Sequence, residues 1–391
     1  MSAAKRTRKV AVVGVALSDC GRVEEATPYA LHAQAARRAL ADSGLDRSVV
    51  DGFASAGLGT LAPLEVAEYL GLRPTWTDST AVGGATWEVM AAHAADAIAA
   101  GHARAVLLVY GSTARADIRA GRRTANLSFG ARGPLQFEVP YGHTLIAKYA
   151  MAARRHMHEY GTTLEQLADI AVQARANAAH NPDAMFRDPI TVDDVLSGPM
   201  IADPFTKLHC CIRSDGGCAV LLVGEEYVPD TVPPPVWVLG SGTALSHTTM
   251  SEWDDFTVSP AAVSGRAAFR RAGVRPSEID VAQLYDAFTY MTLVTLEDLG
   301  FCAKGEGGAF AAKGRLTLGG ELPTNTDGGG LSACHPGMRG LFLLVEAVRQ
   351  LRGEAGDRQV RGAGGRLPEL AVASGTGGWF CSSGTVVLGR G

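Results

Sequence analysis

Long apolar runs alternate with amphipathic segments along the chain. The first run, Val10 to Leu17, is almost wholly apolar and is followed by AQAARRALADSGLD, whose apolar residues recur at helical spacing. Similar runs occupy residues 105–112 and 370–378, and a second helical segment, LFLLVEAVRQLRG, ends at Gly353. Near-continuous apolar runs are typical of strands buried on both faces, and glycine commonly ends a helix. The pattern therefore predicts an α/β protein whose sheets are covered by helices on both faces.

The same succession of elements occurs twice. The first half opens with KVAVVGV and the second with VWVLGSG, each followed by an Ala/Arg-rich helix, and they close with the similar segments SDGGCAVLLVGEE and SSGTVVLGRG. Between them lie four prolines, which cannot continue a helix or a central strand: Pro229, Pro233, Pro234 and Pro235. We therefore predict two copies of one α/β unit, residues 1–228 and 229–391.

Residues about 115–210 do not fit the repeat. They hold helical sequence, LEQLADIAVQARANAAHN, and several loops. An insertion of this size in one half often builds a lid or a substrate channel. Tyr141 and His143 fall within it and are candidates for lining an acyl or coenzyme A channel.

Composition narrows the classes of function. The 391 residues suit two domains, and the net charge of -4 announces no basic face for nucleic acid. The seven cysteines are irregularly spaced without a CxxC pair, so we expect neither a disulfide framework nor a zinc site, and a reducing cytoplasm fits. No His/Cys/Asp grouping has metal-ligand spacing. No apolar stretch is long enough to span a bilayer, and the first run is too short for a signal peptide.

Three segments in order resemble the thiolase superfamily, and within it the sterol-carrier-protein thiolase branch with its actinobacterial lipid-transfer-protein homologues. They are SDGGCAVLLV (214–223), QLYDAFTYMTLVTLEDLGFCAKGEGGAF (283–310) and NTDGGGLSACHPGMRG (325–340). The resemblance covers essentially the whole chain. It implies a thiolase fold, two duplicated βαβαβαββ-type halves in a layered αβαβα arrangement, with a loop insertion in the N-terminal half. It also implies a homodimer acting on a coenzyme A thioester, without a separate cofactor.

A condensing thiolase needs a nucleophilic cysteine, a second cysteine, a histidine, and an asparagine or histidine that completes the oxyanion site. The resemblance places the nucleophile at about Gly84, where the helix that ends at Gly101 begins, and the second cysteine at about Ser374. Neither position is cysteine. The histidine is present as His335, and Tyr285 stands where an asparagine or histidine is usual. The covalent apparatus is therefore expected to be missing.

The remaining groups suit a reaction that needs no nucleophile. Polarising a thioester carbonyl lets the α-carbon leave as an enolate, so removing the proton of a β-hydroxyl breaks the Cα–Cβ bond in a retro-aldol cleavage. Tyr285 is the candidate base or proton relay and His335 the enolate-side donor, and the two roles could be exchanged. The branch includes thiolase-like aldolases of steroid side-chain breakdown, which release a ketone and a short acyl-CoA. They work with a small protein that has a zinc ribbon and an oligonucleotide-fold domain, and the resemblance implies such a partner here.

Further residues are assigned to the site on weaker grounds. Gly84 and Thr86 open a helix whose N-terminus favours an oxyanion. Contacts with substrate or coenzyme A are also predicted for Gly337, Gly375 and Gly377. Three residues are possible additions: Cys334 as a displaced thiol, although packing is favoured, Asp286, although a cap of the next helix is favoured, and Tyr290 on the same cleft.

Two other functions stay open from the sequence alone. The missing cysteines also suit a non-catalytic homologue that binds acyl-CoA or lipid, or that serves as a scaffold. A thiolytic acyltransferase would require a relocated cysteine such as Cys334.

Overall fold

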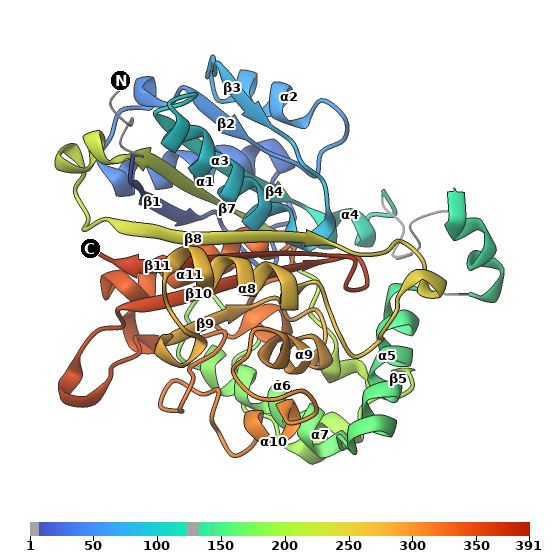
Figure 1. The fold of residues 1–391 in the computed structure, drawn as a ribbon. Helices are drawn as coiled ribbons and strands as arrows, with labels where there is room; N and C mark the ends of the chain where they lie inside the picture. The colour runs from blue at the N-terminus through green and yellow to red at the C-terminus, as the bar shows by residue number, and fades with distance from the viewer. Residues whose placement is uncertain (1–7, 123–132, 143) are drawn as a thin grey trace, which may run out of the picture.

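The computed structural model describes residues 8–122, 133–142 and 144–391, and its strands form a repeated pattern (Figure 1). The first half contains β1 (Val10–Leu17), α1 (Pro28–Ser43), β2 (Gly52–Ala54), α2 (Ala62–Tyr69), β3 (Trp76–Asp78), α3 (Thr86–Ala100), β4 (Ala105–Ser112) and β7 (Gly216–Gly224). The second contains β8 (Val236–Leu245), α8 (Ala261–Ala272), β9 (Val281–Leu284), α9 (Thr289–Asp298), α10 (Gly307–Ala311), α11 (Gly340–Arg352), β10 (Leu370–Gly377) and β11 (Ser382–Arg390).

The strand pairing of one half repeats in the other. In the first half β1 pairs antiparallel with β7, β7 antiparallel with β4, and β4 parallel with β2, which pairs parallel with β3. In the second half β8, β11, β10 and β9 repeat the first three of these pairings, and a parallel bridge from Ala282 to Thr324 stands where β3 would be. The predicted duplication is therefore confirmed. The halves join through two residue pairs between β1 and β8, Ala11–Trp237 and Val12–Val236.

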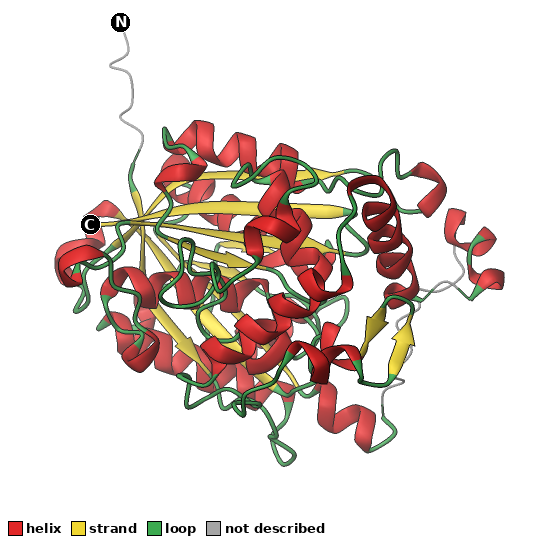
Figure 2. Cartoon of the chain, turned by 90° about the horizontal axis from the view of Figure 1, so that it is seen from below, coloured by secondary structure: helices red, strands yellow, loops and turns green. Residues whose placement is uncertain are grey.

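Two helices fill the wedge between the halves. The strands converge near the C-terminus and spread apart from there (Figure 2). Helix α3 contacts β4 and β7 of its own half and β8, β10 and β11 of the other, and α11 likewise contacts strands of both halves. Helices α1 and α8 cover the outer faces, against β1 and β8 respectively. The layers therefore follow the predicted αβαβα order.

Helix α3 is buried almost all round, and its one buried acid, Glu88, has no hydrogen-bond partner. Neither carboxylate oxygen of Glu88 accepts a hydrogen bond, and burial raises its pKa well above the ordinary value. Glycines make room for it, since a Cβ would lie 2.5 Å from Glu88 Oε2 at Gly340, 2.0 Å from the same atom at Gly375, and 2.7 Å from Glu88 Cβ at Gly384. Burial inside the central layer therefore favours the uncharged form of the side chain.

The insertion of the first half lies against the second half. It contains α4 (Ala114–Arg119), α5 (Leu145–Tyr160), α6 (Leu164–Ala178), α7 (Val192–Leu196), β5 (Met200–Ala202) and β6 (Phe205–Thr206). The predicted helix at 164–181 is α6, which begins with a capping box between Thr163 and Gln166. Helix α6 contacts α9, α10 and the π-helical turn Gly329–Ala333 (Figure 1). The boundary at residue 228 falls in the 3-10 turn Glu225–Asp230, and that division stays a prediction.

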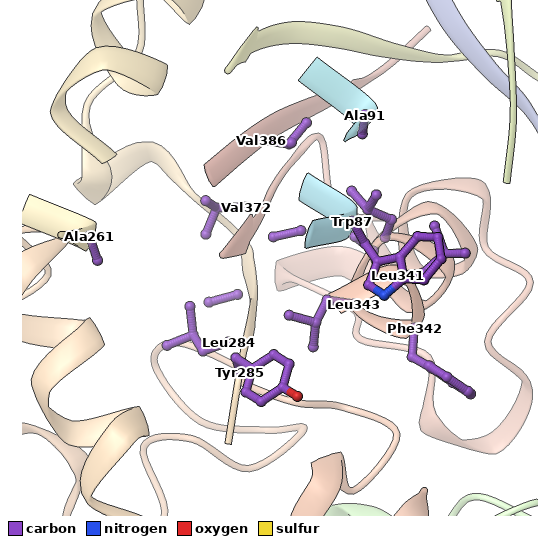
Figure 3. Packing of buried hydrophobic residues seen from close by; sticks show 14 of the residues in the cluster. Trp87, Ala91, Ala261, Leu284, Tyr285, Leu341, Phe342, Leu343, Val372 and Val386 are labelled. Atoms are coloured by element: carbon purple, nitrogen blue, oxygen red, sulfur yellow. The ribbon is translucent and has the colours of Figure 1, made fainter. Parts of the chain in front are cut away.

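The apolar core is continuous across the central layer. Trp87, Leu341 and Leu343 of the two central helices share one core cluster with Val372 of β10 and Val386 of β11 (Figure 3). Within the described ranges, no helix combines the length and apolar character needed to cross a membrane.

Candidate active site

The two residues predicted to be catalytic meet in the structure. Tyr285 directly follows β9, and its N–H donates to Ser374 O at 3.0 Å, which fixes the backbone against β10. Its hydroxyl oxygen lies 3.0 Å from His335 Nε2, within hydrogen-bond distance. Figure 3 shows Tyr285 at the margin of the core cluster, with its hydroxyl group pointing away from Leu284. Strand β9 and the loop before α11 therefore bring together residues 50 positions apart in the chain.

The ring of Tyr285 occupies the space beside Gly84. A Cβ at position 84 would lie 2.4 Å from both Cε2 and Cζ of Tyr285 and 2.3 Å from Thr376 O. Any side chain at this position, including that of a nucleophilic cysteine, would collide with the ring and the backbone. The aromatic ring thus fills the space beside the position at which the resemblance places the nucleophilic cysteine of a thiolase, a contact that the sequence pattern did not reveal.

We expect Gly84→Ala to damage both stability and the site. Forcing one methyl group against the ring should cost about 1–3 kcal/mol of unfolding free energy and displace the tyrosine hydroxyl from His335. Urea unfolding and single-turnover rates measure the two effects. Gly319→Ala is the matched control, because no atom lies within 4 Å of a Cβ built there. Equal behaviour of the two variants would contradict the close approach.

Two residues that the sequence analysis missed hold the loop of His335. Ser214 Oγ accepts the His335 N–H at 2.9 Å, and Tyr110 donates its hydroxyl to Pro336 O at 2.7 Å. The Tyr110 oxygen also accepts the Met338 N–H at 3.2 Å. Ser214 lies in one of the segments that carry the resemblance, but neither residue belongs to a pattern that marks it as a support.

A buried ionic cluster lies behind the histidine. The guanidinium of Arg339, fully buried, donates to both carboxylate oxygens of Asp327 at 2.6 Å and to Cys334 O at 2.7 Å. Its Nε lies 3.6 Å from an oxygen of Asp286. The cation therefore links two carboxylates to the backbone immediately before His335.

The predicted role of Asp286 as a cap of the next helix is wrong. Helix α9 has no side-chain cap at Phe288. Asp286 instead accepts the N–H groups of Gly330 at 2.8 Å and Leu331 at 3.3 Å, so it anchors the π-helical turn Gly329–Ala333. Glycine is required at 329, because φ is +67° and a Cβ would lie 1.9 Å from Asp286 Oδ2.

The environment keeps both members of the pair uncharged at neutral pH. Burial, with the nearby charge of Arg339, lowers the pKa of His335 to about 4. Burial raises the pKa of Tyr285 well above its usual value, although a hydrogen bond from the Arg339 backbone opposes this. Burial also raises the pKa of Asp286 to about 7, against the effect of Arg339. A neutral imidazole can accept a proton from the phenol, which suits a relay.

The N-termini of both central helices meet at this pair. Helix α3 begins just after Gly84, and α11 begins at Gly340, whose Cβ would lie 2.5 Å from Gly84 O. Helix N-termini carry partial positive charge and free N–H groups, which favour an anion. The place beside Tyr285 and His335 can therefore stabilise a developing enolate oxygen.

Several predicted ligand-contact residues have structural reasons for their identity. Thr86 is buried, and its hydroxyl accepts the Val82 N–H at 2.9 Å. Gly377 lies against the backbone, since a Cβ would be 1.8 Å from Val82 O, and Gly375 faces Glu88. Their contacts with substrate, like that of Gly337 at φ +102°, stay predictions.

The other aromatic residues predicted for the site are either apart from the Tyr285–His335 pair or outside the residues that the structure describes. Tyr290 is fully buried and donates its hydroxyl to Phe256 O at 3.2 Å, and in the described part of the chain no hydrogen bond joins it to Tyr285 or His335. Tyr141 is 78% exposed on the 3-10 turn Val139–Tyr141. His143 lies outside the described residues.

The cysteines near the pair are not placed as nucleophiles. The Cys334 thiol lies 3.1 Å from Ser214 Oγ and 3.8 Å from Asp215 O, so its hydrogen bonds go to that segment. Burial raises the pKa of the Cys211 thiol, which disfavours the nucleophilic thiolate form. A thiolate at this position would also raise the pKa of Tyr285. Across residues 8–122, 133–142 and 144–391, no group of three or more His, Cys, Asp or Glu side chains is placed to hold a metal ion.

Comparison with known proteins agrees with this fold. The family described as "Thiolase C-terminal domain-like" matches residues 242–390. A steroid side-chain-cleaving aldolase from Thermomonospora curvata is 34% identical over 94% of this chain and 95% of its own length. An acetyl-CoA acetyltransferase from Methanothermobacter thermautotrophicus is 33% identical over 91% of this chain and 94% of its own length. The solved structure of an Ltp2-ChsH2(DUF35) aldolase matches with a TM-score of 0.87 and 30% identity over 98% of each chain.

The chain belongs to the thiolase superfamily. Within it, the chain groups with the sterol-carrier-protein and lipid-transfer branch, which also contains steroid side-chain-cleaving aldolases.

Proposed function

We propose that this chain is an acyl-CoA carbon–carbon lyase. It cleaves the Cα–Cβ bond of a 3-hydroxyacyl-CoA whose β-carbon carries a steroid or similar bulky group, and it releases a ketone and a shorter acyl-CoA. The single observation that carries the proposal is the position of the Tyr285 side chain. Its ring lies against Gly84, and its hydroxyl oxygen lies 3.0 Å from His335 Nε2. A proton relay stands where covalent attack would otherwise begin.

The reaction follows from these neutral groups. Tyr285 accepts the β-hydroxyl proton while passing its own proton to His335 Nε2, and the Cα–Cβ electrons move into the thioester as an enolate. Backbone N–H groups at the starts of α3 and α11 favour the enolate oxygen. The proton then returns from the pair to the α-carbon. One O–H and one C–C bond break, a C=O double bond and a C–H bond form, and no oxidant or metal is required for the balance.

The contacts of Gly84 favour one of the two activities named for the relatives. The acetyltransferase and the steroid aldolase are about equally similar to this chain, at 33% and 34% identity. Acyl transfer through a cysteine needs a thiolate at the start of α3, and Gly84 leaves no room for one. The geometry therefore supports cleavage over thiolysis.

The proposal extends to the partner protein, the oligomeric state and the cellular compartment. The partner that the resemblance implies is a small acyl-CoA-associated protein with a zinc ribbon and an oligonucleotide-fold domain. The name of the similar aldolase structure, which pairs Ltp2 with the DUF35 protein ChsH2, supports a two-protein assembly. We further propose a homodimer, or a heterotetramer with that partner, in the cytoplasm. Coenzyme A is part of the substrate, and neither a cofactor nor a nucleic acid takes part.

The direct experiment supplies a β-hydroxy, β-branched acyl-CoA to the chain together with such a partner protein. Release of a ketone with acetyl-CoA or propionyl-CoA is expected, and mass spectrometry and gas chromatography detect the products. Binding of a range of these thioesters without any cleavage would favour a non-catalytic carrier instead. Thiolysis that is lost on alkylating Cys334 would favour an acyltransferase.

The lowered pKa of His335 predicts an unusual pH profile. Because the imidazole must be neutral to accept the proton, protonation of His335 should lower kcat/KM only as the pH approaches about 4. An ordinary histidine would cause the fall near pH 6.5. Steady-state rates, with circular dichroism at each pH as a check of folding, measure the profile. A half-point near 6.5 would show that the site does not hold the imidazole neutral.

A further inference from the structure

The hairpin that joins β10 and β11 packs directly against the start of α3. A Cβ at Gly83 would lie 2.9 Å from Gly377 Cα and 2.9 Å from Gly378 N. The backbone just before α3 therefore has no free space on the side of the hairpin. Since Gly83 is followed by Gly84, a shift of the hairpin would change the place of the backbone against which the Tyr285 ring packs.

The tip of this hairpin has a backbone conformation that aromatic residues rarely adopt. Phe380 has a φ of +58°, in the left-handed region, and its side chain is fully buried. A bulky residue is strained there, and such strain persists only where the surrounding structure imposes it. Gly378 has a φ of +60° without that cost. Phe380 therefore needs a contact that holds the tip in this shape.

Tyr149, on helix α5 of the insertion, provides this contact. Its side chain is 1% exposed, and its hydroxyl donates to Gly378 O at 2.9 Å while it accepts the Phe380 N–H at 3.1 Å. Its ring centre lies 5.0 Å from that of Phe380 and 4.9 Å from that of Phe288. Phe288 belongs to the short segment between β9 and α9 that begins with Tyr285. One buried side chain therefore supports the hairpin tip and the segment of the catalytic tyrosine.

The preceding residue of α5 also contacts the tip. The Lys148 ammonium nitrogen lies 3.6 Å from the centre of the Trp379 ring, in a cation–π contact, and it pairs with the carboxylate of Glu138. Two consecutive residues of the insertion thus hold the hairpin, Tyr149 through its backbone and Lys148 through the side chain of Trp379.

We propose that Tyr149 is a positioning residue of the lyase site, which acts through the hairpin to keep Gly84 and the Tyr285 ring in place. In the part of the chain that the structure describes, no hydrogen bond joins Tyr149 to Tyr285 or His335, so it takes no direct part in proton transfer. Its hydroxyl holds the strained tip, and the tip fixes the backbone N–H groups at the start of α3. These groups favour the enolate oxygen, so a small shift should weaken the transition state more than the binding of substrate. This role rests on the proposed function.

The test compares Tyr149→Phe with the unaltered chain, each together with the partner protein. The variant keeps the ring and loses only the oxygen that bonds the tip. We expect kcat to fall by about 100-fold, the effect of a displacement of about 1 Å at a reacting group, while KM changes by less than about twofold. Hydrogen exchange should become faster at residues 376–384 and 82–86. Circular dichroism at the assay temperature checks that the variant is folded.

Tyr290→Phe is the matched control, because Tyr290 is also fully buried and also donates one hydrogen bond, to Phe256 O. It should leave both kcat and the exchange at residues 82–86 unchanged. If Tyr149→Phe is too unstable to assay, Lys148→Met combined with Glu138→Gln loosens the same tip without leaving an unpaired carboxylate. That double variant should show the same fall in kcat at nearly constant KM.

Three results would overturn the proposal: an unchanged kcat, a rise in KM alone, or equal exchange at residues 82–86 in Tyr149→Phe and the unaltered protein. A rise in KM alone would place Tyr149 in substrate binding instead. If the unaltered protein cleaves no substrate, the proposed function fails. The exchange at residues 82–86 then decides by itself whether Tyr149 positions this backbone.

Discussion

Replacing Tyr285 with phenylalanine should lower kcat/KM for cleavage by about 100–1,000-fold while the fold stays intact. The variant keeps the ring that packs on Gly84 and removes only the oxygen that lies 3.0 Å from His335 Nε2. The proton relay is then broken, and the enolate loses a neighbouring donor. Steady-state kinetics with the partner protein, and thermal unfolding of the chain alone, separate the two effects.

Tyr290, which lies five residues after Tyr285, offers a matched control with the same kind of side chain. Tyr290 is also fully buried and also donates one hydrogen bond, to Phe256 O. Tyr290→Phe should therefore cost about 1 kcal/mol of stability and leave the rate nearly unchanged. If both variants retained full activity, Tyr285 would have no part in the reaction.

Replacing Arg339 with methionine should destabilise the fold by about 3–5 kcal/mol. The change leaves the carboxylates of Asp286 and Asp327 buried without their cation, and it also removes the donor to Cys334 O. Urea unfolding measures the loss. The pKa of His335 should rise at the same time, because the positive charge that helps to lower it is gone.

Two further variants test whether the loss of stability comes from the buried charges. Adding Asp327→Asn to the Arg339→Met variant should recover part of the stability, because one of the two stranded charges is removed. Arg275→Met breaks an exposed pair with Glu278, and it should change stability by less than about 1 kcal/mol. A loss in Arg339→Met no larger than that would show that the buried cluster contributes little.

The sequence could predict the repeated architecture and the central pair, for a physical reason in each case. Buried strands and helices impose periodic apolar patterns, and the copy that begins at Val236 follows the same pattern as the copy that begins at Val10. Tyr285 and His335 lie in segments whose resemblance to a family assigns them one site.

Other features of the site could not be predicted from the sequence, because they depend on contacts between residues that are distant in the chain. Nothing local to Gly84 shows that the Tyr285 ring fills the adjacent space, and nothing around Ser214 or Tyr110 marks them as supports of the His335 loop. Asp286 was misassigned because its spacing to α9 suits a cap, whereas its real partners, Gly330 and Leu331, lie over 40 positions away.

The close packing of the Tyr285 ring against Gly84 also limits which substitutions could change the chemistry of such a protein. A cysteine introduced at 84 alone would meet the phenol, and a smaller residue introduced at 285 alone would leave an empty hollow with neither a relay nor a thiol. Each single substitution therefore lacks both a working relay and a working thiol, and acyl transfer through sulfur would need at least both changes together. The glycine at 84 and the aromatic ring at 285 are thus mutually dependent, and neither position can change alone without a loss of function or of packing.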